Sequence, residues 1–452
     1  MKNYLNNLPK ELQDLIYLAR DIADRNNMPA YLVGGCVRDL ILRVKNLDLD
    51  IVVEGEGIKF AEILSGKLNA DLIRHRRFGT ATVMLKKHLK VGPSTSLEGH
   101  GERSRTIDIA TARQEYYPEA AHLPEVICGV LKDDLMRRDF TINAMAISIN
   151  RQDFGRFIDC FGGKQDLADK KIRILHELSF IDDPTRILRA VRFEQRYNFK
   201  IEQETLKLLR EANESKMLEK VSRERLRDEL ILVLKEARPL KPLNRIKGLI
   251  GFDFIKSGLS LSKKSSVFLK SVEKQINWFK MKYPKRRQLD AWLIYFIVLI
   301  DPININNVKF ICKKFVFRRG EEKRILAYKK LSAKIIKELS RDKIKPSGVF
   351  RLLEPLSYEV VILIKAKFSR RSGIPQNAGK GFNIKKHIEV FFEVYNGTHL
   401  YISGVDLHKL GLTPGPYYKK IFHRVLNAKL NGLVKTKKEE LELIDNITKR
   451  IK

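Results

Sequence analysis

Two aspartates in the segment LDLDIVV have the spacing of a paired metal site. Asp48 and Asp50 alternate with aliphatic residues, which predicts a strand over 47–53 with both carboxylates on one face. Paired carboxylates suit Mg²⁺, and two such ions can assist an in-line displacement at a phosphate. A lone pair of aspartates on a strand is structural more often than catalytic, so the residues around it must decide.

A pair of glycines, Gly34 and Gly35, precedes the aspartates. The pair follows a predicted strand over 31–33 and opens a predicted helix over 37–43. Without Cβ atoms, the backbone amides there can approach a triphosphate near the start of the helix. Such a glycine pair upstream of two spaced aspartates favours the catalytic interpretation.

The two motifs together resemble a known family. GGCVRD followed by DLD is similar to the first signature of the class II CCA-adding enzymes and poly(A) polymerases, within the polymerase-β-like nucleotidyltransferases. The similarity covers residues 28–235 and implies a Mg²⁺-dependent RNA nucleotidyltransferase. The residues that the resemblance assigns here are the metal ligands Asp48 and Asp50 and the nucleotide-binding residues Gly34, Gly35 and Arg38.

A third acidic position, Asp108, lies in the segment TIDIATAR, which predicts a strand over 106–112. The wider superfamily has its third carboxylate at this place, so the resemblance implies that Asp108 is catalytic. The preceding segment, 87–105, is rich in Gly, Ser and charged residues and predicts a loop. The sequence suggests no function for that loop.

The block RRDFTINAMA resembles the family's ribose- and phosphate-binding motif. Taken alone, two arginines and an aspartate would indicate a surface ion-pair cluster. The resemblance assigns Asp139 to the ribose 2′-OH and places Arg138 and Asn143 around the sugar and phosphates. A carboxylate that accepts from a 2′-OH disfavours deoxynucleotides, because these leave it unpaired.

The segment IDDPTRILRAVRF resembles the family's EDxxR block, in which side chains replace a nucleic-acid template. Its charged residues fall at steps of three on a helix predicted over 183–197, which would otherwise indicate an ordinary ion-paired helix. Asp183 can only accept hydrogen bonds and Arg186 can only donate them, so together they complement C and A but not U or G. Position 182 is Asp in place of Glu, which keeps the chemistry. The nucleotide-binding residues implied by this block are Asp183, Arg186, Arg189 and Arg192.

Three further segments match the family. IDCFGGKQDL resembles its hinge, and VSRERLRDEL resembles its neck helix, which we expect to be structural or to help orient the nucleotide-selecting helix. Residues 113–134 correspond to its flexible loop region. Family members divide the labour, since some add all of CCA, some only CC and some only the terminal A. The loop sequence does not decide between these activities.

The charge is concentrated in one part of the chain. The 452 residues carry a formal net charge of +33. Residues 1–200 have 32 basic and 28 acidic side chains, whereas residues 201–452 have 55 and 26. Such an excess of positive charge indicates a surface that binds a polyanion, in preference to one that is merely rich in lysine. We expect the C-terminal half to bind the acceptor and T arms of tRNA by shape and backbone contacts.

The periodicities predict an α+β fold, with a polymerase-β-like α/β head followed by an elongated all-helical neck, body and tail. We expect a catalytic head over 1–160, a neck with the nucleotide-selecting helix over 161–235, and a basic tRNA-binding body and tail over 236–452. Scattered cysteines and an N-terminus without a signal peptide predict a cytoplasmic protein. The longest apolar run, Ala291–Ile300, is too short for a bilayer, and no protein partner is evident.

The sequence therefore predicts an enzyme that adds C, A or both to the tRNA 3′ end from CTP and ATP. The first alternative is a poly(A) polymerase of the same family. A second alternative is an inactive RNA-binding protein. It is less favoured, because the carboxylates and the RRD block are intact. A small-molecule nucleotidyltransferase would not need so basic a C-terminal half.

Overall fold

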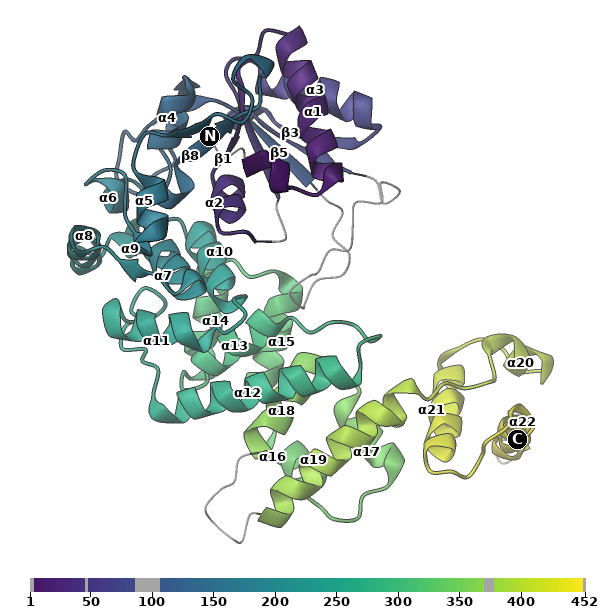
Figure 1. The fold of residues 1–452 in the computed structure, drawn as a ribbon. Helices are drawn as coiled ribbons and strands as arrows, with labels where there is room; N and C mark the ends of the chain where they lie inside the picture. Colours follow the sequence, from purple (N-terminus) through teal and green to yellow (C-terminus); the bar gives the residue numbers. More distant parts are fainter. Residues whose placement is uncertain (1–3, 45–47, 86–105, 370–377, 450–452) are drawn as a thin grey trace. The chain divides into compact units, whose positions relative to one another are not determined.

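The computed structural model describes residues 4–44, 48–85, 106–369 and 378–449. The chain divides into two compact units, Met1–Ser260 and Leu261–Lys452 (Figure 1). The predicted loop over 87–105 and the first residue of the strand predicted over 47–53 lie outside the described residues. The three-part division into head, neck and body stays a prediction.

The first unit contains a seven-stranded mixed sheet in the order β3-β4-β5-β2-β1-β8-β9. Its strands are β1 (Ala30–Val33), β2 (Leu49–Val53), β3 (Asp71–His75), β4 (Thr80–Met84), β5 (Thr106–Thr111), β8 (Met145–Ser148) and β9 (Phe157–Asp159). β2 and β5 pair in parallel, and the other neighbours are antiparallel. The central strands carry the predicted catalytic carboxylates.

Alternation along β2, β4 and β5 gives the sheet two chemically different faces. Ile51, Val83 and Ile109 are buried on one face, where α3 (Gly57–Leu68) packs against β4 and β5. The intervening positions, which include Asp50 and Asp108, point to the opposite face. The apolar residues thus anchor the sheet to α3 and leave the acidic positions free for chemistry.

The helices of the first unit surround the sheet and continue beyond it (Figure 1). They are α1 (Lys10–Arg25), α2 (Gly35–Ile41), α3, α4 (Leu131–Met136), α5 (Gly163–Ala168), α6 (Ser179–Asp182), α7 (Thr185–Tyr197), α8 (Gln203–Glu214), α9 (Met217–Lys220), α10 (Arg223–Leu234) and α11 (Leu240–Leu249). A hairpin of β6 (Arg113–Tyr116) and β7 (Glu125–Cys128) and a two-residue ladder of β10 (Lys171–Ile172) and β11 (Lys200–Ile201) complete the strands. α7 packs against both α10 and α11.

In the second unit, all regular secondary structure among the described residues is helical. Its helices are α12 (Lys263–Lys282), α13 (Ala291–Leu299), α14 (Ile305–Lys314), α15 (Arg319–Lys329), α16 (Ala333–Leu339), α17 (Pro346–Leu353), α18 (Tyr358–Phe368), α19 (Ala378–Glu393), α20 (Gly404–Lys409), α21 (Pro416–Leu430) and α22 (Lys437–Lys449). The most apolar of them, α13, is buried from Trp292 to Leu299 against α12 and α18. In the described part of the chain, no helix combines the length and apolar character needed to span a membrane. An α+β head followed by helices is the fold class that the sequence predicts.

Candidate active site

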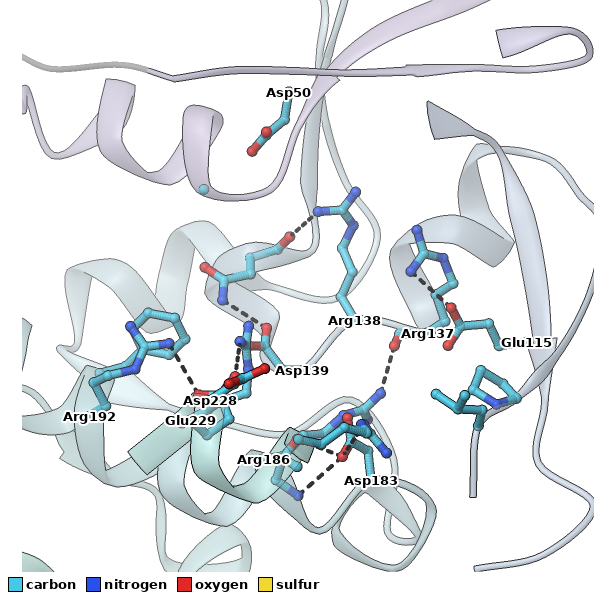
Figure 2. Close-up of a pocket in the computed structure, with 18 of the residues that line it drawn as sticks. Asp50, Glu115, Arg137, Arg138, Asp139, Asp183, Arg186, Arg192, Asp228 and Glu229 are labelled. Atoms are coloured by element: carbon cyan, nitrogen blue, oxygen red, sulfur yellow. Dashed lines mark hydrogen bonds and ion pairs between the residues drawn. The ribbon is translucent and has the colours of Figure 1, made fainter. Parts of the chain in front are cut away.

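A cavity of about 720 Å³ lies in the first unit. Asp50 lies at one end of the residues drawn, and Asp183 and Arg186 lie at the other (Figure 2). The predicted site residues that line the cavity are Gly35, Arg38, Asp50, Arg138, Asp139, Asn143, Asp183, Arg186, Arg189 and Arg192. Gly34, Asp48 and Asp108 are not among its lining residues.

Asp50 and Asp108 occupy opposite positions on the neighbouring strands β2 and β5. Asp108 is exposed, and its Oδ1 accepts a hydrogen bond of 2.6 Å from the Thr82 hydroxyl. Asp48 is also exposed and immediately precedes β2. Asp50 thus faces the cavity, while Asp108 stands beside it outside the cavity.

The electrostatics around Asp50 suit a cation. Burial raises the pKa of the Asp50 carboxyl to about 6, and the charges of Asp108 and Asp48 add to the rise, although Arg138 opposes it. Within the described residues, no group of three or more His, Cys, Asp or Glu side chains could hold a metal ion. The predicted metal ligands Asp48 and Asp50, with Asp108 opposite Asp50, offer the oxygen donors that a divalent ion prefers, and substrate phosphate or water would supply its remaining ligands.

Glycine is needed at position 34 for a second reason, besides the access that it gives to backbone amides. Gly34 has φ +65°, a conformation that favours glycine, and a Cβ atom there would lie 2.2 Å from Nη1 of Arg138. The Arg138 guanidinium donates through Nη2 to Oδ2 of Asp134 at 2.8 Å. Gly34 therefore makes room for a predicted phosphate- and sugar-binding arginine.

Asp139 is buried and already has several hydrogen-bond donors. Its Oδ1 accepts from the Phe140 amide at 2.9 Å and from Asn143 Nδ2 at 2.8 Å. Its Oδ2 accepts from Arg189 through Nε at 2.9 Å and Nη2 at 2.6 Å. Burial would raise the pKa of Asp139, but the charge of Arg189 and these hydrogen bonds lower it to about 2. The contact of Asp139 with a ribose hydroxyl stays a prediction. It would be made by an ionised carboxylate that already accepts hydrogen bonds at both oxygens.

The predicted helix over 183–197 is interrupted at its first residues. Asp183 caps the C-terminus of α6, and α7 begins only at Thr185. The expected spacing on one helix therefore holds for the three arginines but not for Asp183. Pro184 explains the break, since proline disfavours helical backbone in the residue before it.

Arg186 lies in the first turn of α7 and is buried. Its Nη1 donates to the Ser179 hydroxyl at 2.6 Å, and its Nη2 donates to the Arg137 carbonyl at 2.7 Å. These two bonds tie the predicted base-selecting arginine to α6 and to the RRD segment. Its guanidinium keeps further N–H groups that can donate to a base.

Arg189 and Arg192 connect α7 to α10 through Glu229. Arg189 Nη1 donates to Oε1 of Glu229 at 3.1 Å, and Arg192 Nη2 lies 3.7 Å from its Oε2. The Nε atom of Arg192 is buried and has no hydrogen-bond partner in the described part of the chain.

Several cavity residues were not predicted from the sequence. Glu115 accepts from Arg113 at 2.7 Å and from Arg137 at 3.2 Å, and the Tyr117 hydroxyl donates to it at 2.9 Å. In the sequence, only their positions pointed to these residues. Arg137 lies in the RRD block, and the other three lie in the loop region over 113–134. Phe78 lines the same cavity without any signal in the sequence. The other lining residues of this group are Leu123, Pro124, Thr185, Phe193, Arg196, Arg225, Asp228 and Glu229.

Two segments of the chain match models of known protein families. Residues 30–173 match the model described as Poly A polymerase head domain. Residues 198–247 match the model described as Probable RNA and SrmB-binding site of polymerase A. The first match includes the carboxylate strands and the RRD segment, and the second includes α10.

Full-length similarity decides the family. The chain is 32% identical to the Thermotoga maritima CCA-adding enzyme in its solved complex with tRNA, with a TM-score of 0.67 over 98% of each chain. The chain belongs to the class II tRNA nucleotidyltransferase family. This membership confirms the resemblance that the sequence motifs indicate.

Two curated members of this family are A-adding tRNA nucleotidyltransferases. The one from Geobacter sulfurreducens is 34% identical over 96% of this chain and 47% of its own length. The one from Aquifex aeolicus is 38% identical over 74% of this chain and 38% of its own length. The chain thus spans about half or less of these two relatives. Class II tRNA nucleotidyltransferases normally use a divalent metal ion, which agrees with the carboxylates predicted as ligands, Asp48 and Asp50.

Proposed function

We propose that this chain transfers CMP, AMP or both from CTP and ATP to the 3′ end of tRNA, with release of pyrophosphate. The observation that carries the proposal is one cavity with Asp50 at one end and the Asp183–Arg186 pair at the other (Figure 2). A nucleotide bound between them would present its phosphates to the carboxylates and its base to the pair. The family similarity supports the same reaction.

The terminal A is the addition that we propose for this chain in particular. Both curated relatives named above carry the A-adding name. Asp183 and Arg186 offer an acceptor and a donor, which complement the N6 amino group and N1 of adenine. The same groups complement cytosine, so CC addition and complete CCA addition are the alternatives that the assay below separates.

The carboxylates would hold Mg²⁺, with Asp48 and Asp50 as ligands and Asp108 opposite Asp50 on the neighbouring strand. When bound, the ions would lower the cost of charge developing at the phosphate and activate the tRNA 3′-hydroxyl. Thr82 keeps Asp108 in place by its hydrogen bond of 2.6 Å. Arg38 and Arg138 lie near Asp50 and would neutralise the triphosphate.

The tRNA would be held mainly by the C-terminal half. Residues 201–452 carry most of the net positive charge, which favours contact with the phosphates of the acceptor and T arms. We propose residues 1–160 as the catalytic head, 161–235 as the neck and 236–452 as the tRNA-binding body and tail. Four free cysteines are compatible with a reducing compartment, and we propose the cytoplasm.

Three tRNA transcripts test the reaction. They end at the discriminator base, at C and at CC, and each is incubated with CTP, ATP or both in the presence of Mg²⁺. A single A on the CC transcript alone is the expected result. Complete CCA on the shortest transcript, or arrest after CC, would assign one of the other two activities.

The same assay tests the two alternative functions. The head-domain match carries the description of a poly(A) polymerase, and long A tails on any RNA would favour that activity. Absence of incorporation on all three transcripts, with retained tRNA binding, would favour an RNA-binding protein. Neither outcome is compatible with a tRNA A-adding enzyme.

A further inference from the structure

Arg38 is a buried arginine on α2 that lines the cavity. Two nitrogens of its guanidinium are already bonded, since Nε donates to Oδ1 of Asp39 at 2.8 Å and Nη1 donates to Oδ1 of Asn143 at 2.5 Å. The third nitrogen, Nη2, lies near the glycine turn. A Cβ atom at Gly35 would be 3.5 Å from Nη2 and 3.9 Å from Oδ2 of Asp50. Nη2 is therefore close to the place where we propose that the triphosphate binds.

Two aromatic rings from α7 pack against the Arg38 guanidinium. Its Cζ lies over the ring of Tyr197, 4.8 Å from the ring centroid, and 5.5 Å from the ring centroid of Phe193. The two rings are themselves stacked, with their centroids 6.0 Å apart and 23° between their planes. A guanidinium is attracted to the face of an aromatic ring, and more strongly where water is excluded. The guanidinium is thus held by hydrogen bonds at two nitrogens and by rings from a different helix.

Tyr197, the last residue of α7, is itself well fixed. Besides its stack on Phe193, its ring packs against Phe199 with centroids 5.7 Å apart. Its hydroxyl lies 3.4 Å from Oδ1 of Asp39 and donates to it, so Tyr197 contacts both members of the Arg38–Asp39 ion pair. Phe193 lines the cavity, but Tyr197 does not. Any effect of Tyr197 on a bound nucleotide must therefore pass through the residues that it contacts.

We propose that Tyr197 is a positioning residue for triphosphate binding, whose ring holds the Arg38 guanidinium so that Nη2 can donate to the phosphates beside Asp50. The inference rests on the proposed function. Without the ring, the guanidinium keeps its two hydrogen bonds but can tilt about them. Restoring its orientation then costs part of the free energy of triphosphate binding. A nucleoside without phosphates does not meet this cost, so its affinity should change little.

The test compares the variants Tyr197→Leu and Tyr197→Phe with a matched control, Tyr17→Leu. The first removes the ring, and the second keeps the ring but removes the hydroxyl. Tyr17, on α1, has the same kind of surroundings outside the cavity. Its ring is stacked on Phe154 with centroids 5.4 Å apart, and Cζ of Arg20 lies 4.9 Å from its centroid. Thermal unfolding establishes that each variant is folded, and Tyr197→Met is a second variant without the ring if Tyr197→Leu is not.

The readout is the equilibrium affinity for ATP and for adenosine, with Mg²⁺ and without tRNA. If the wild-type chain adds C, CTP and cytidine are compared in the same way. Tyr197→Leu should weaken ATP binding about tenfold, the size of a shielded cation–π contact, and adenosine binding by less than about twofold. Tyr197→Phe should keep most of the affinity for ATP, and Tyr17→Leu should leave both affinities unchanged.

A double-mutant cycle with Arg38→Gln shows whether the ring acts through Arg38. Arg38→Gln alone should weaken ATP binding by about tenfold or more, because the proposed phosphate-binding charge is removed. In the Arg38→Gln background, Tyr197→Leu should have little further effect, since no guanidinium remains to be positioned. A general loosening of α7 would instead weaken binding to the same extent in both backgrounds.

Wild-type affinity for ATP in the folded variant without the ring would overturn the role of Tyr197, while the proposed function would stand. Equal losses for ATP and adenosine, or additive effects in the cycle, would also overturn it, because the ring would then not act through Arg38. A wild-type chain that adds neither C nor A to any tRNA transcript would instead overturn the proposed function itself, and the role of Tyr197 with it.

Discussion

Asp50 and Asp108 lie directly opposite each other on the parallel strands β2 and β5, with Asp50 facing the cavity and Asp108 exposed beside it. The two residues are far apart in the sequence and are brought together only by the strand pairing. The pairing register therefore sets the geometry of the proposed catalytic carboxylates, because a slip by one residue would turn one of them to the buried face. This relationship underlies the predictions that follow.

Replacement of Asp50 by Ala should lower nucleotide transfer by roughly a thousandfold or more, since a proposed metal ligand is removed. The affinity for tRNA should remain nearly unchanged, because the basic surface is untouched. Single-turnover incorporation and a tRNA binding titration measure the two effects. Asp71→Ala, at an exposed position on β3, is the control. Loss of binding with residual activity would contradict the assigned role.

Replacement of Thr82 by Val should reduce transfer about tenfold, because Asp108 loses the hydroxyl that donates to its Oδ1. Thr82→Ser keeps the hydroxyl and should retain most of the activity. The effect should appear in kcat, with the KM for ATP little changed, since Thr82 does not line the cavity. Equal losses in the two variants would show that packing of the side chain matters and the hydrogen bond does not.

Replacement of Gly34 by Ala should weaken nucleotide binding and destabilise the fold by about 1–2 kcal/mol, because φ is positive there. The new methyl group would also displace Nη1 of Arg138, only 2.2 Å from the Cβ position. Gly66→Ala is the control, since a Cβ there meets no atom within 4 Å. The Tm and the affinity for ATP should fall in the first variant only, since Gly66 lies within α3, where alanine is favoured over glycine. Unaltered ATP binding in Gly34→Ala would refute the spatial argument.

Replacement of Asp139 by Asn should destabilise the first unit by about 3–5 kcal/mol, because Arg189 loses its buried counter-charge. The same pair predicts a pH dependence. The pKa of Asp139 in the fold, about 2, lies below its ordinary value of 3.8. Its stabilisation is therefore fully present above about pH 4 and is lost as the pH falls toward 2.

Thermal unfolding of the wild type and Asp139→Asn as a function of pH checks this linkage. The difference in Tm between them should be constant above about pH 5 and should shrink as the pH falls from 4 to 2. A difference that grows on acidification would contradict a lowered pKa for Asp139.

The sequence predicted the parts of the fold that have regular hydrophobic periodicity. The strands expected over 31–33 and 106–112 agree with β1 and β5 to within one residue. β3 was missed because it is an edge strand with mostly exposed residues, so it shows no alternation of apolar side chains. The hairpin of β6 and β7 was missed because each strand has only four residues and β6 is polar.

The candidate site could be predicted where motifs carry the chemistry, but not where partners come from distant segments. The RRD block indicates Asp139, yet nothing local shows that Arg189 would fill one of its oxygens. The break before α7 could have been anticipated from Pro184. The ion pair between Arg225 and Asp183 could not, because it depends on how α10 packs against α7.

Incorporation of AMP into a tRNA transcript ending in CC, by the wild type and Asp50→Ala side by side, tests the central claim most directly. The account predicts that the wild type adds one A in the presence of Mg²⁺ and ATP, and that the variant binds the transcript but adds none. Addition by both proteins at similar rates, or by neither, would contradict a nucleotidyltransferase site built on Asp50.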